Sequence, residues 1–172
     1  IDDFMFTHLA GEKDLYLVVN GATKEGDFAY MADKLKGHAA LTPKPDRALL
    51  ALQGPVAGKV LEKLSPGIDT MTFMHVRRAT VAGCPAIVSR SGYTGEDGFE
   101  ISLEGKDVEK VARALLADPD VLPIGLAARD SLRLEAGLCL YGHDIDETVD
   151  PAEANLVWSI GKRRKMDKDF PA

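Results

Sequence analysis

The residues whose types and spacing could do chemistry are concentrated at positions 91–100. This stretch holds three glycines, two aromatic rings and three acids, and it follows an apolar run at residues 86–88. A hairpin that serves only as a turn needs one or two glycines. Here the loop is longer and leads into a strand-like run that carries Glu100. One interpretation is a loop whose backbone approaches a flat, polar ligand, with Tyr93 stacking on it and Glu100 hydrogen-bonding to it. The other is a long glycine-rich turn, and the spacing alone favours neither.

A second group of polar residues lies within residues 125–137, a run of strong helix formers that ends in a glycine. Arg129 and Arg133 are four positions apart, so they share one face of the predicted helix. Two arginines on a mostly apolar helix suggest an anionic or carboxylate partner. An ion pair with a purely structural role explains the same pattern.

The remaining polar residues match no standard catalytic or metal-binding motif. The loop at 92–95 lacks the G-K-[ST] of a phosphate loop, and Ser91 does not sit in G-x-S-x-G. The histidines are scattered, and the acidic segment at 144–147 lacks the alternating ligands of a calcium loop. We therefore expect no metal site. Carboxylates, Arg129 and aromatic rings remain, and these suit an enzyme that binds a heterocycle and moves protons.

Composition places the chain among ordinary globular proteins of one domain or two small ones. It has 172 residues, of which 45% are apolar and 28% charged, with a net charge of -6 and interleaved signs. This balance argues against a nucleic-acid surface, and no apolar run is long enough to span a membrane. Cys84 and Cys139 have no paired spacing and fit a reduced, intracellular compartment. The short basic run at 162–165 is expected to be a solvated loop rather than a phosphate or polyglutamate contact.

The elements that must position these residues follow from hydrophobic periodicity. Strands are predicted at residues 4–9, 15–19, 48–52, 76–81, 84–89, 99–103 and 156–160. Helices are predicted from 23 to a closing Gly37, after Pro55 up to 64, from a cap at Asp107 to 115, and over 125–137. Short hairpins that alternate with helices, without a βαβ rhythm, indicate an α+β fold with antiparallel sheets and flanking helices.

Several of these segments together resemble a known family. The run GYTGEDG at 92–98, the run GLAARDSLRLEAGLCLY at 125–141, IDD at 1–3, ALQGP at 51–55 and GKRR at 161–164 are similar to the aminomethyltransferases, the T-proteins of the glycine cleavage system. The likeness covers nearly the whole chain. It implies a transfer of the one-carbon unit from the aminomethyl-dihydrolipoyl arm of the H-protein to tetrahydrofolate. Ammonia is released and 5,10-methylenetetrahydrofolate is formed.

The resemblance also assigns roles to individual residues. Asp3 matches the catalytic aspartate, and Glu100 matches the acid that hydrogen-bonds the pterin. Arg129 matches the arginine that meets the glutamate tail of the folate, while Asn20 and Tyr93 match pocket positions around the pterin ring. A carboxylate suits the adjacent N–H donors of a pterin, and an arginine fork suits an anionic tail.

The family further implies two interleaved subdomains with folate between them. Residues 1–43 would form part of the first, and residues 44–172 the second, with about 129–142 returning to the first. Members of the family have a segment before the first residue of this chain and a barrel-like domain after its last. We therefore expect the chain to be a piece of a longer protein at both ends. The resemblance also implies a monomer outside transient contact with the H-protein, working in bacterial cytoplasm or the mitochondrial matrix.

Three other interpretations compete with this one. Non-enzymatic folate-binding relatives in iron–sulfur cluster assembly carry a K-G-C-[FY]-x-G-Q-E-type motif, where this chain has Gly92-Tyr93-Thr94-Gly95-Glu96-Asp97. Folate-dependent transferases or demethylases of the same superfamily, such as those in sarcosine and dimethylglycine oxidases, diverge most around residues 132–141. An inert structural fragment is the third.

Overall fold

The computed structural model describes residues 1–168 and divides into two compact units. Unit 1 combines residues 1–4 with the chain from residue 139 onward, and unit 2 is residues 5–138. Residues 170–172, where the sequence carries no clear stop signal, lie outside the described residues. The subdomain division that we expect at residues 43 and 44 concerns the complete family fold and stays a prediction.

Unit 2 is built on a four-stranded antiparallel sheet. Its strands are β3 (Arg47–Gln53), β4 (Val76–Val81), β5 (Cys84–Ser89) and β6 (Gly98–Glu104), in the order β3-β6-β5-β4. Strands β4 and β5 form the predicted hairpin, and positive φ angles at Ala82 (49°) and Gly83 (78°) match the two-residue turns that suit the twist of a hairpin. The predicted α+β fold with antiparallel sheets is confirmed.

Strand β6 gives the sheet two different faces. Phe99, Ile101 and Leu103 are fully buried and belong to the hydrophobic core. Because side chains alternate along a strand, the residues between them, Glu100 and Ser102, face the other way. The same sequence therefore supplies the core on one side of the sheet and polar groups on the other.

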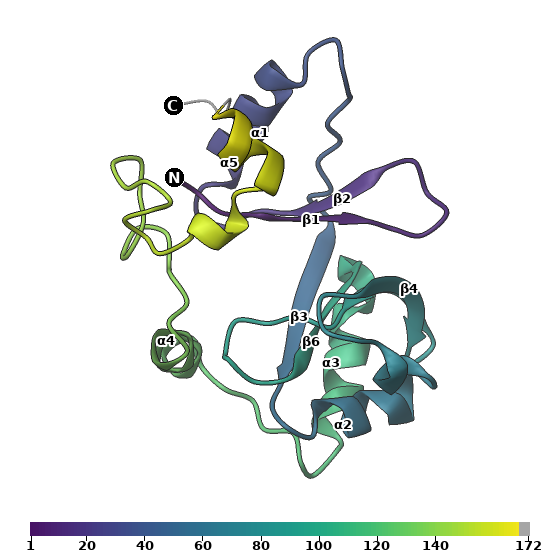
Figure 1. The fold of residues 1–172 in the computed structure, drawn as a ribbon. Coiled ribbons are helices and arrows are strands. Elements are labelled where there is room, and N and C mark those ends of the chain that lie inside the picture. Colours follow the sequence, from purple (N-terminus) through teal and green to yellow (C-terminus); the bar gives the residue numbers. More distant parts are fainter. Residues whose placement is uncertain (169–172) are drawn as a thin grey trace. The chain divides into compact units, whose positions relative to one another are not determined.

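Two helices pack on the core face of the sheet (Figure 1). They are α2 (Ala57–Leu64), which contributes Val60 and Leu61 to the core, and α3 (Val108–Leu116), which contributes Val111 and Leu115. Short 3-10 helices at Ile68–Thr70 and Gly105–Asp107 connect these elements to the sheet. Both helices were predicted, and Asp107 is at the N-cap of α3, although its side chain makes no capping hydrogen bond.

A two-stranded hairpin lies on the opposite face of the sheet. Strands β1 (Met5–His8) and β2 (Leu15–Val18) pair antiparallel, and each end lies within one residue of its predicted position. The hydroxyl of Tyr16 lies 2.6 Å from that of Ser102 on β6, and Arg78 of β4 donates to both carboxylate oxygens of Glu12, at 2.5 and 2.9 Å. Helix α1 (Lys24–Lys34) follows, and the turn after it contains Gly37 at φ 81°. The hairpin is thus attached to the sheet by side-chain hydrogen bonds.

Helix α4 (Leu126–Glu135) follows α3 in unit 2 and ends before Gly137, whose φ is 73°. It carries exposed apolar side chains at Leu126 and Leu134. Arg133 is its buried residue and sits in an ion pair with Asp130 at 2.8 Å. For Arg133, the interpretation as part of an ion pair with a structural role is therefore the right one.

Unit 1 is mostly turns. The acidic segment at 144–147 is a loop, as predicted, in which Asp144 accepts the backbone N–H of Leu140 at 3.0 Å. Hydrogen bonds from the side chain and backbone of Thr148 lower the pKa of Asp146. These carboxylates therefore hold the backbone of the loop in place.

Two predictions in unit 1 were wrong in detail. The sequence predicts a strand at residues 156–160, but a 3-10 helix spans Val157–Ser159. Within residues 1–168 no strand pairs with this short apolar run, and the backbone closes on itself, with the Ser159 N–H donating to the Leu156 carbonyl at 2.9 Å. The basic run at 162–165 is not a loop. It begins α5 (Lys162–Asp167), and its side chains are solvent-exposed, as expected.

We predict that Phe99→Ala lowers the free energy of unfolding by about 3–5 kcal/mol, because it leaves a cavity at the centre of the core. Phe99 is 0% exposed, whereas Phe73 is 75% exposed and provides a matched control. Urea denaturation followed by circular dichroism measures both. A Phe73→Ala variant that lost as much stability as Phe99→Ala would contradict this description of the core.

Candidate functional site

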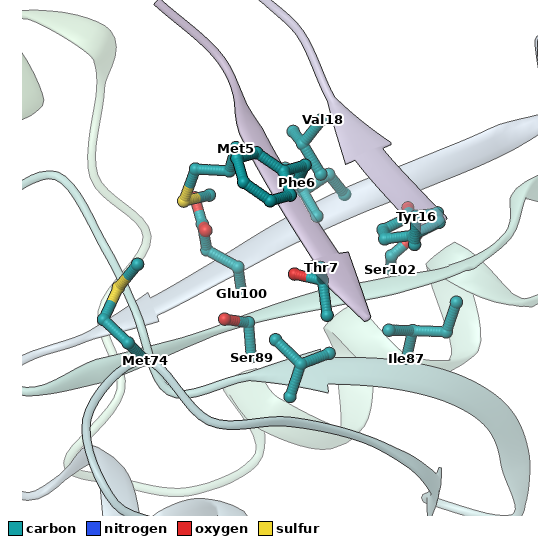
Figure 2. A pocket seen from close by; sticks show the side chains of 12 residues that line it. Met5, Phe6, Thr7, Tyr16, Val18, Met74, Ile87, Ser89, Glu100 and Ser102 are labelled. Atoms are coloured by element: carbon teal, nitrogen blue, oxygen red, sulfur yellow. The ribbon is translucent and has the colours of Figure 1, made fainter. Parts of the chain in front are cut away.

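A cavity of about 70 Å³ lies between the β1–β2 hairpin and the polar face of the sheet (Figure 2). Most of its lining residues are apolar, and these come from the hairpin, β3, β4, β5 and Met74. Its polar lining residues are Thr7, Tyr16, Ser89, Glu100 and Ser102. Glu100 carries the carboxylate among these lining residues, so it defines the chemistry of the cavity.

Glu100 is held in position by Ser91, and Ser89 lies opposite it on the neighbouring strand. Ser89 is its direct cross-strand partner on β5, and Ser91 donates a hydrogen bond from its hydroxyl to Glu100 Oε2 at 2.8 Å. The hydroxyls of Ser91 and Ser89 lie 2.7 Å apart. Figure 2 shows the Glu100 side chain extending from the sheet toward Met5 of the hairpin. The carboxylate is thus directed into the cavity with one oxygen fixed.

An arginine fork closes the loop that joins β5 to β6. Arg90 donates from Nε and Nη2 to the two carboxylate oxygens of Asp97, at 2.9 and 2.6 Å. Its Nη1 also donates to the backbone carbonyls of Asp69 and Met71, at 2.9 and 2.6 Å. The hydrogen bonds from Arg90 lower the pKa of Asp97, and the same bonds raise the pKa of Arg90. Such a bidentate, charge-assisted pair fixes both ends of the loop.

The side chain of Gln53 fills the inside of this loop. Its amide nitrogen donates to the carbonyls of Ser91 and Phe99, at 3.1 and 3.3 Å, and its amide oxygen accepts from the hydroxyl of Thr94 at 3.2 Å. A Cβ atom at Gly92 would lie only 1.8 Å from this amide oxygen. Glycine at position 92 therefore makes room for the Gln53 side chain. The sequence suggested close approach to a ligand as the reason for this glycine, whereas the structure gives packing as a reason.

Tyr93 and Arg129, which are distant in sequence, meet in the structure. The guanidinium of Arg129 lies 4.5 Å from the centre of the Tyr93 ring, within the range of a cation–π interaction. Helix α4 also touches the loop at Gly95, where φ is 76° and a Cβ atom would lie 2.6 Å from Cβ of Ala136. An exposed cation and an aromatic face therefore form one surface on unit 2.

Four of the five predicted site residues lie within unit 2, and two of these, Tyr93 and Arg129, are in contact. Glu100 lines the cavity, while Tyr93 and Arg129 stack at the loop that begins beside it. Asn20 belongs to the same unit, is half-buried and lies two residues beyond the end of β2. Asp3 lies in unit 1, where it is exposed and its backbone N–H donates to Asp2 at 2.8 Å. The roles of all five residues stay predictions.

Sequence reasoning missed Gln53, Ser89 and Ser91. Each stands next to a predicted turn, where a polar residue is expected for turn chemistry alone. One available signal was the alternation along residues 86–89 and 99–103, which places Ser89 on the same face of the sheet as Glu100.

Some kinds of site do not occur in the part of the chain that the structure describes. Within residues 1–168, no three His, Cys, Asp or Glu side chains gather closely enough to hold a metal ion. The helices of the same residues include none that is both long and apolar enough to cross a membrane.

Comparison with known proteins identifies the family. The family model described as the GCVT N-terminal domain matches residues 1–164. The chain belongs to this family, and aminomethyltransferases are among its curated relatives. The mitochondrial aminomethyltransferase of Dictyostelium discoideum is 43% identical over 187 residues, which cover 99% of this chain and 46% of the relative. That of Homo sapiens is 46% identical over 180 residues, covering 99% and 44% respectively. The chain therefore spans less than half the length of these relatives.

Solved structures agree with this assignment. The crystal structure of glycine cleavage system aminomethyltransferase T from Bartonella henselae matches with a TM-score of 0.89 and 42% identity, over 99% of this chain and 46% of that protein. A heterotetrameric sarcosine oxidase from Corynebacterium matches with a TM-score of 0.53 and 18% identity, over 77% of this chain and 63% of that chain. The second likeness concerns the fold alone.

We predict that the Arg90–Asp97 pair contributes stability that depends on pH. The pKa of Asp97 is lower in the folded protein, so the contribution is fully present above the pKa of an unfolded aspartate, about 3.9, and is lost as pH falls through the folded value. The stability difference between wild type and Asp97→Asn should therefore be largest near neutral pH and shrink below about pH 4. Urea denaturation at a series of pH values measures it.

Glu96→Gln is the matched control, because it removes one exposed negative charge from the same loop. It should change stability little at any pH. A difference for Asp97→Asn that stayed constant from neutral to acidic pH would show that the ion pair is not its source.

Proposed function

We propose that the protein to which this chain belongs is an aminomethyltransferase of glycine cleavage. It transfers the one-carbon unit from the aminomethyl-dihydrolipoyl arm of the H-protein to tetrahydrofolate, releases ammonia and forms 5,10-methylenetetrahydrofolate. The observation that carries this proposal is the likeness to aminomethyltransferases along 99% of the chain, at 43% and 46% identity in two of them. The matched residues include those of the cavity and of the loop beside it.

The carboxylate that lines the cavity suits a pterin. A pterin presents its 2-amino group and a ring N–H side by side, and an ionised carboxylate can accept from both. Glu100 provides such a carboxylate among largely apolar side chains, and Ser91 already fixes one of its oxygens. We propose that Glu100 holds the pterin in this way, with Asn20 as a further residue of the ring pocket.

The surface formed by Tyr93 and Arg129 suits the rest of a folate. An aromatic face can stack on a flat ring, and an exposed guanidinium can pair with the carboxylates of a glutamate tail. The stacking distance of 4.5 Å keeps the two groups next to one another, so a single ligand can contact both. We propose that Arg129 binds the tail and that Tyr93 contacts the ring.

The size of the cavity sets a condition on this proposal. Pockets for molecules of this kind measure roughly 300–1,000 Å³, well above the 70 Å³ found here. The β1–β2 hairpin therefore has to move away from the sheet, or the ligand has to reach Glu100 from the open side. Such a movement would break the exposed hydrogen bonds from Arg78 to Glu12 and the part-buried contact of Tyr16 with Ser102.

Asp3 is proposed as the catalytic residue. The carbon–nitrogen bond breaks as ammonia leaves, and one nitrogen of tetrahydrofolate attacks the methylene carbon. The carbon–sulfur bond then breaks and the second folate nitrogen bonds to the same carbon. Each folate nitrogen gives up a proton, and one of these protons goes to the departing thiol. A carboxylate close to the attacking nitrogen can orient it, accept its proton and offset the developing positive charge. Holding the two reactants together supplies much of the remaining rate. No step in this scheme requires a metal ion.

The partners and the compartment follow from the same proposal. The protein would bind lipoylated H-protein transiently and act as a monomer between encounters. It would work in the bacterial cytoplasm or the mitochondrial matrix, where thiols such as those of Cys84 and Cys139 stay reduced. The alternatives named above are a non-enzymatic folate-binding relative and another folate-dependent transferase or demethylase. No observation in the chain favours either of them over the aminomethyltransferase.

The direct test is an assay of ammonia release from aminomethylated H-protein by the full-length protein, with and without tetrahydrofolate. Ammonia release should be stimulated by tetrahydrofolate and accompanied by methylenetetrahydrofolate. Asp3→Asn should lose most of this turnover but keep its affinity for folate, because it removes the charge and not the shape. The neighbouring Asp2→Asn is the control and should stay active. Full turnover in Asp3→Asn would remove Asp3 from the catalytic role.

We predict that Arg129→Ala weakens tetrahydrofolate binding by about ten- to one hundred-fold, because charge-assisted hydrogen bonds contribute about 1.5–3 kcal/mol each. Isothermal titration calorimetry on the full-length protein measures the affinity. Arg113→Ala is the control, since Arg113 is an exposed arginine that pairs with Glu109 on α3. Equal affinities for wild type and Arg129→Ala would exclude Arg129 from the binding site.

A further inference from the structure

Ser91 occupies an unusual place between the loop and the cavity. It is 4% exposed and follows Arg90 directly at the start of the loop. Its backbone carbonyl accepts a hydrogen bond from Gln53 at 3.1 Å, and its hydroxyl donates to Glu100 Oε2 at 2.8 Å. One buried residue is therefore bonded both to the amide inside the loop and to the carboxylate of the cavity.

The hydroxyl of Ser91 has a defined direction. A serine hydroxyl carries one proton, so it can donate to only one acceptor. Two acceptors lie within its reach, Oε2 of Glu100 at 2.8 Å and the hydroxyl oxygen of Ser89 at 2.7 Å. Of these, the carboxylate when ionised gives the stronger, charge-assisted hydrogen bond. Ser91 thus engages Oε2 of Glu100, and among the described residues neither Ser89 nor Ser91 donates to Oε1.

A carboxylate held by one oxygen is better prepared for a ligand than a freely rotating one. The side chain of glutamate has three rotatable torsions, and fixing them at the moment of binding costs affinity. A charge-assisted hydrogen bond from a buried hydroxyl fixes them beforehand. Gln53, in turn, holds the backbone of Ser91 in place.

We propose that Ser91 is a positioning residue for ligand binding. It orients Glu100 for the N–H donors of a flat heterocycle and links that carboxylate to the loop that carries Tyr93. This inference rests on the proposed function, because tetrahydrofolate is taken as the heterocycle. Ser91 itself is not proposed to touch the ligand.

The test compares two variants of equal shape in the full-length protein. Ser91→Thr and Ser91→Val fill nearly the same volume and differ in one hydroxyl. Tetrahydrofolate affinity, measured by calorimetry, should be about ten-fold weaker for Ser91→Val than for Ser91→Thr, which is ~1.4 kcal/mol. Melting temperatures of the two variants show whether both are folded to the same extent. Ser65→Ala, which alters an equally buried serine (3% exposed) at the end of α2, should bind like wild type.

A double-mutant cycle separates positioning from a general effect on the fold. With Glu100 replaced by alanine, Ser91→Ala should change the remaining affinity less than about two-fold, because no carboxylate is left to orient. In the presence of Glu100 the same change should weaken tetrahydrofolate binding about ten-fold. Equal losses in both backgrounds, or equal affinities for Ser91→Val and Ser91→Thr, would overturn this inference alone. Wild-type protein that bound no tetrahydrofolate would overturn the proposed function and this inference with it.

Discussion

The arrangement of unit 2 depends on the hydrogen bonds of one side chain, that of Arg90. Its guanidinium binds the carboxylate of Asp97 across the loop and the carbonyls of Asp69 and Met71 in the preceding segment, and it lies 5.2 Å from the ring of Phe99. A planar fork with several donors can satisfy these partners together, which an ammonium group could not. Because the guanidinium of Arg90 joins both ends of the loop to the core, Tyr93 and Ser91 are held in fixed positions on the loop.

The sheet places the polar residues of the candidate site next to this loop. Residues that alternate along β6 face the core and the cavity in turn, so Glu100 lies between the buried Phe99 and Ile101 and is as well anchored as they are. The adjacent strand places Ser89 directly opposite. The hairpin of β1 and β2 covers the polar face and narrows the space above it to a cavity smaller than a ligand pocket.

Much of this could be predicted from the sequence, and the exceptions have physical reasons. The hairpin at 76–89 was predicted to the residue, because alternation and a two-residue turn both indicate it. The strand expected at 156–160 was wrong, since a short apolar run does not reveal whether a partner strand exists. The contact of Tyr93 with Arg129 joins residues far apart in the chain, which no local pattern encodes. The family resemblance assigned Tyr93 and Arg129 to one ligand. The roles of Gln53 and Ser91 in holding the loop and Glu100 could be recognised only from their hydrogen bonds in the structure.

The two-faced strand β6 also limits how this protein can evolve. Insertion or deletion of a single residue within Gly98–Glu104 would exchange the two faces, turning Glu100 into the apolar core and Phe99 or Ile101 into the cavity. Such a change would damage folding and the site together, while substitutions at single positions would affect one or the other. The length of this strand is therefore constrained more tightly than the identity of any residue in it. Variation in chain length belongs instead at exposed connections such as residues 36–46.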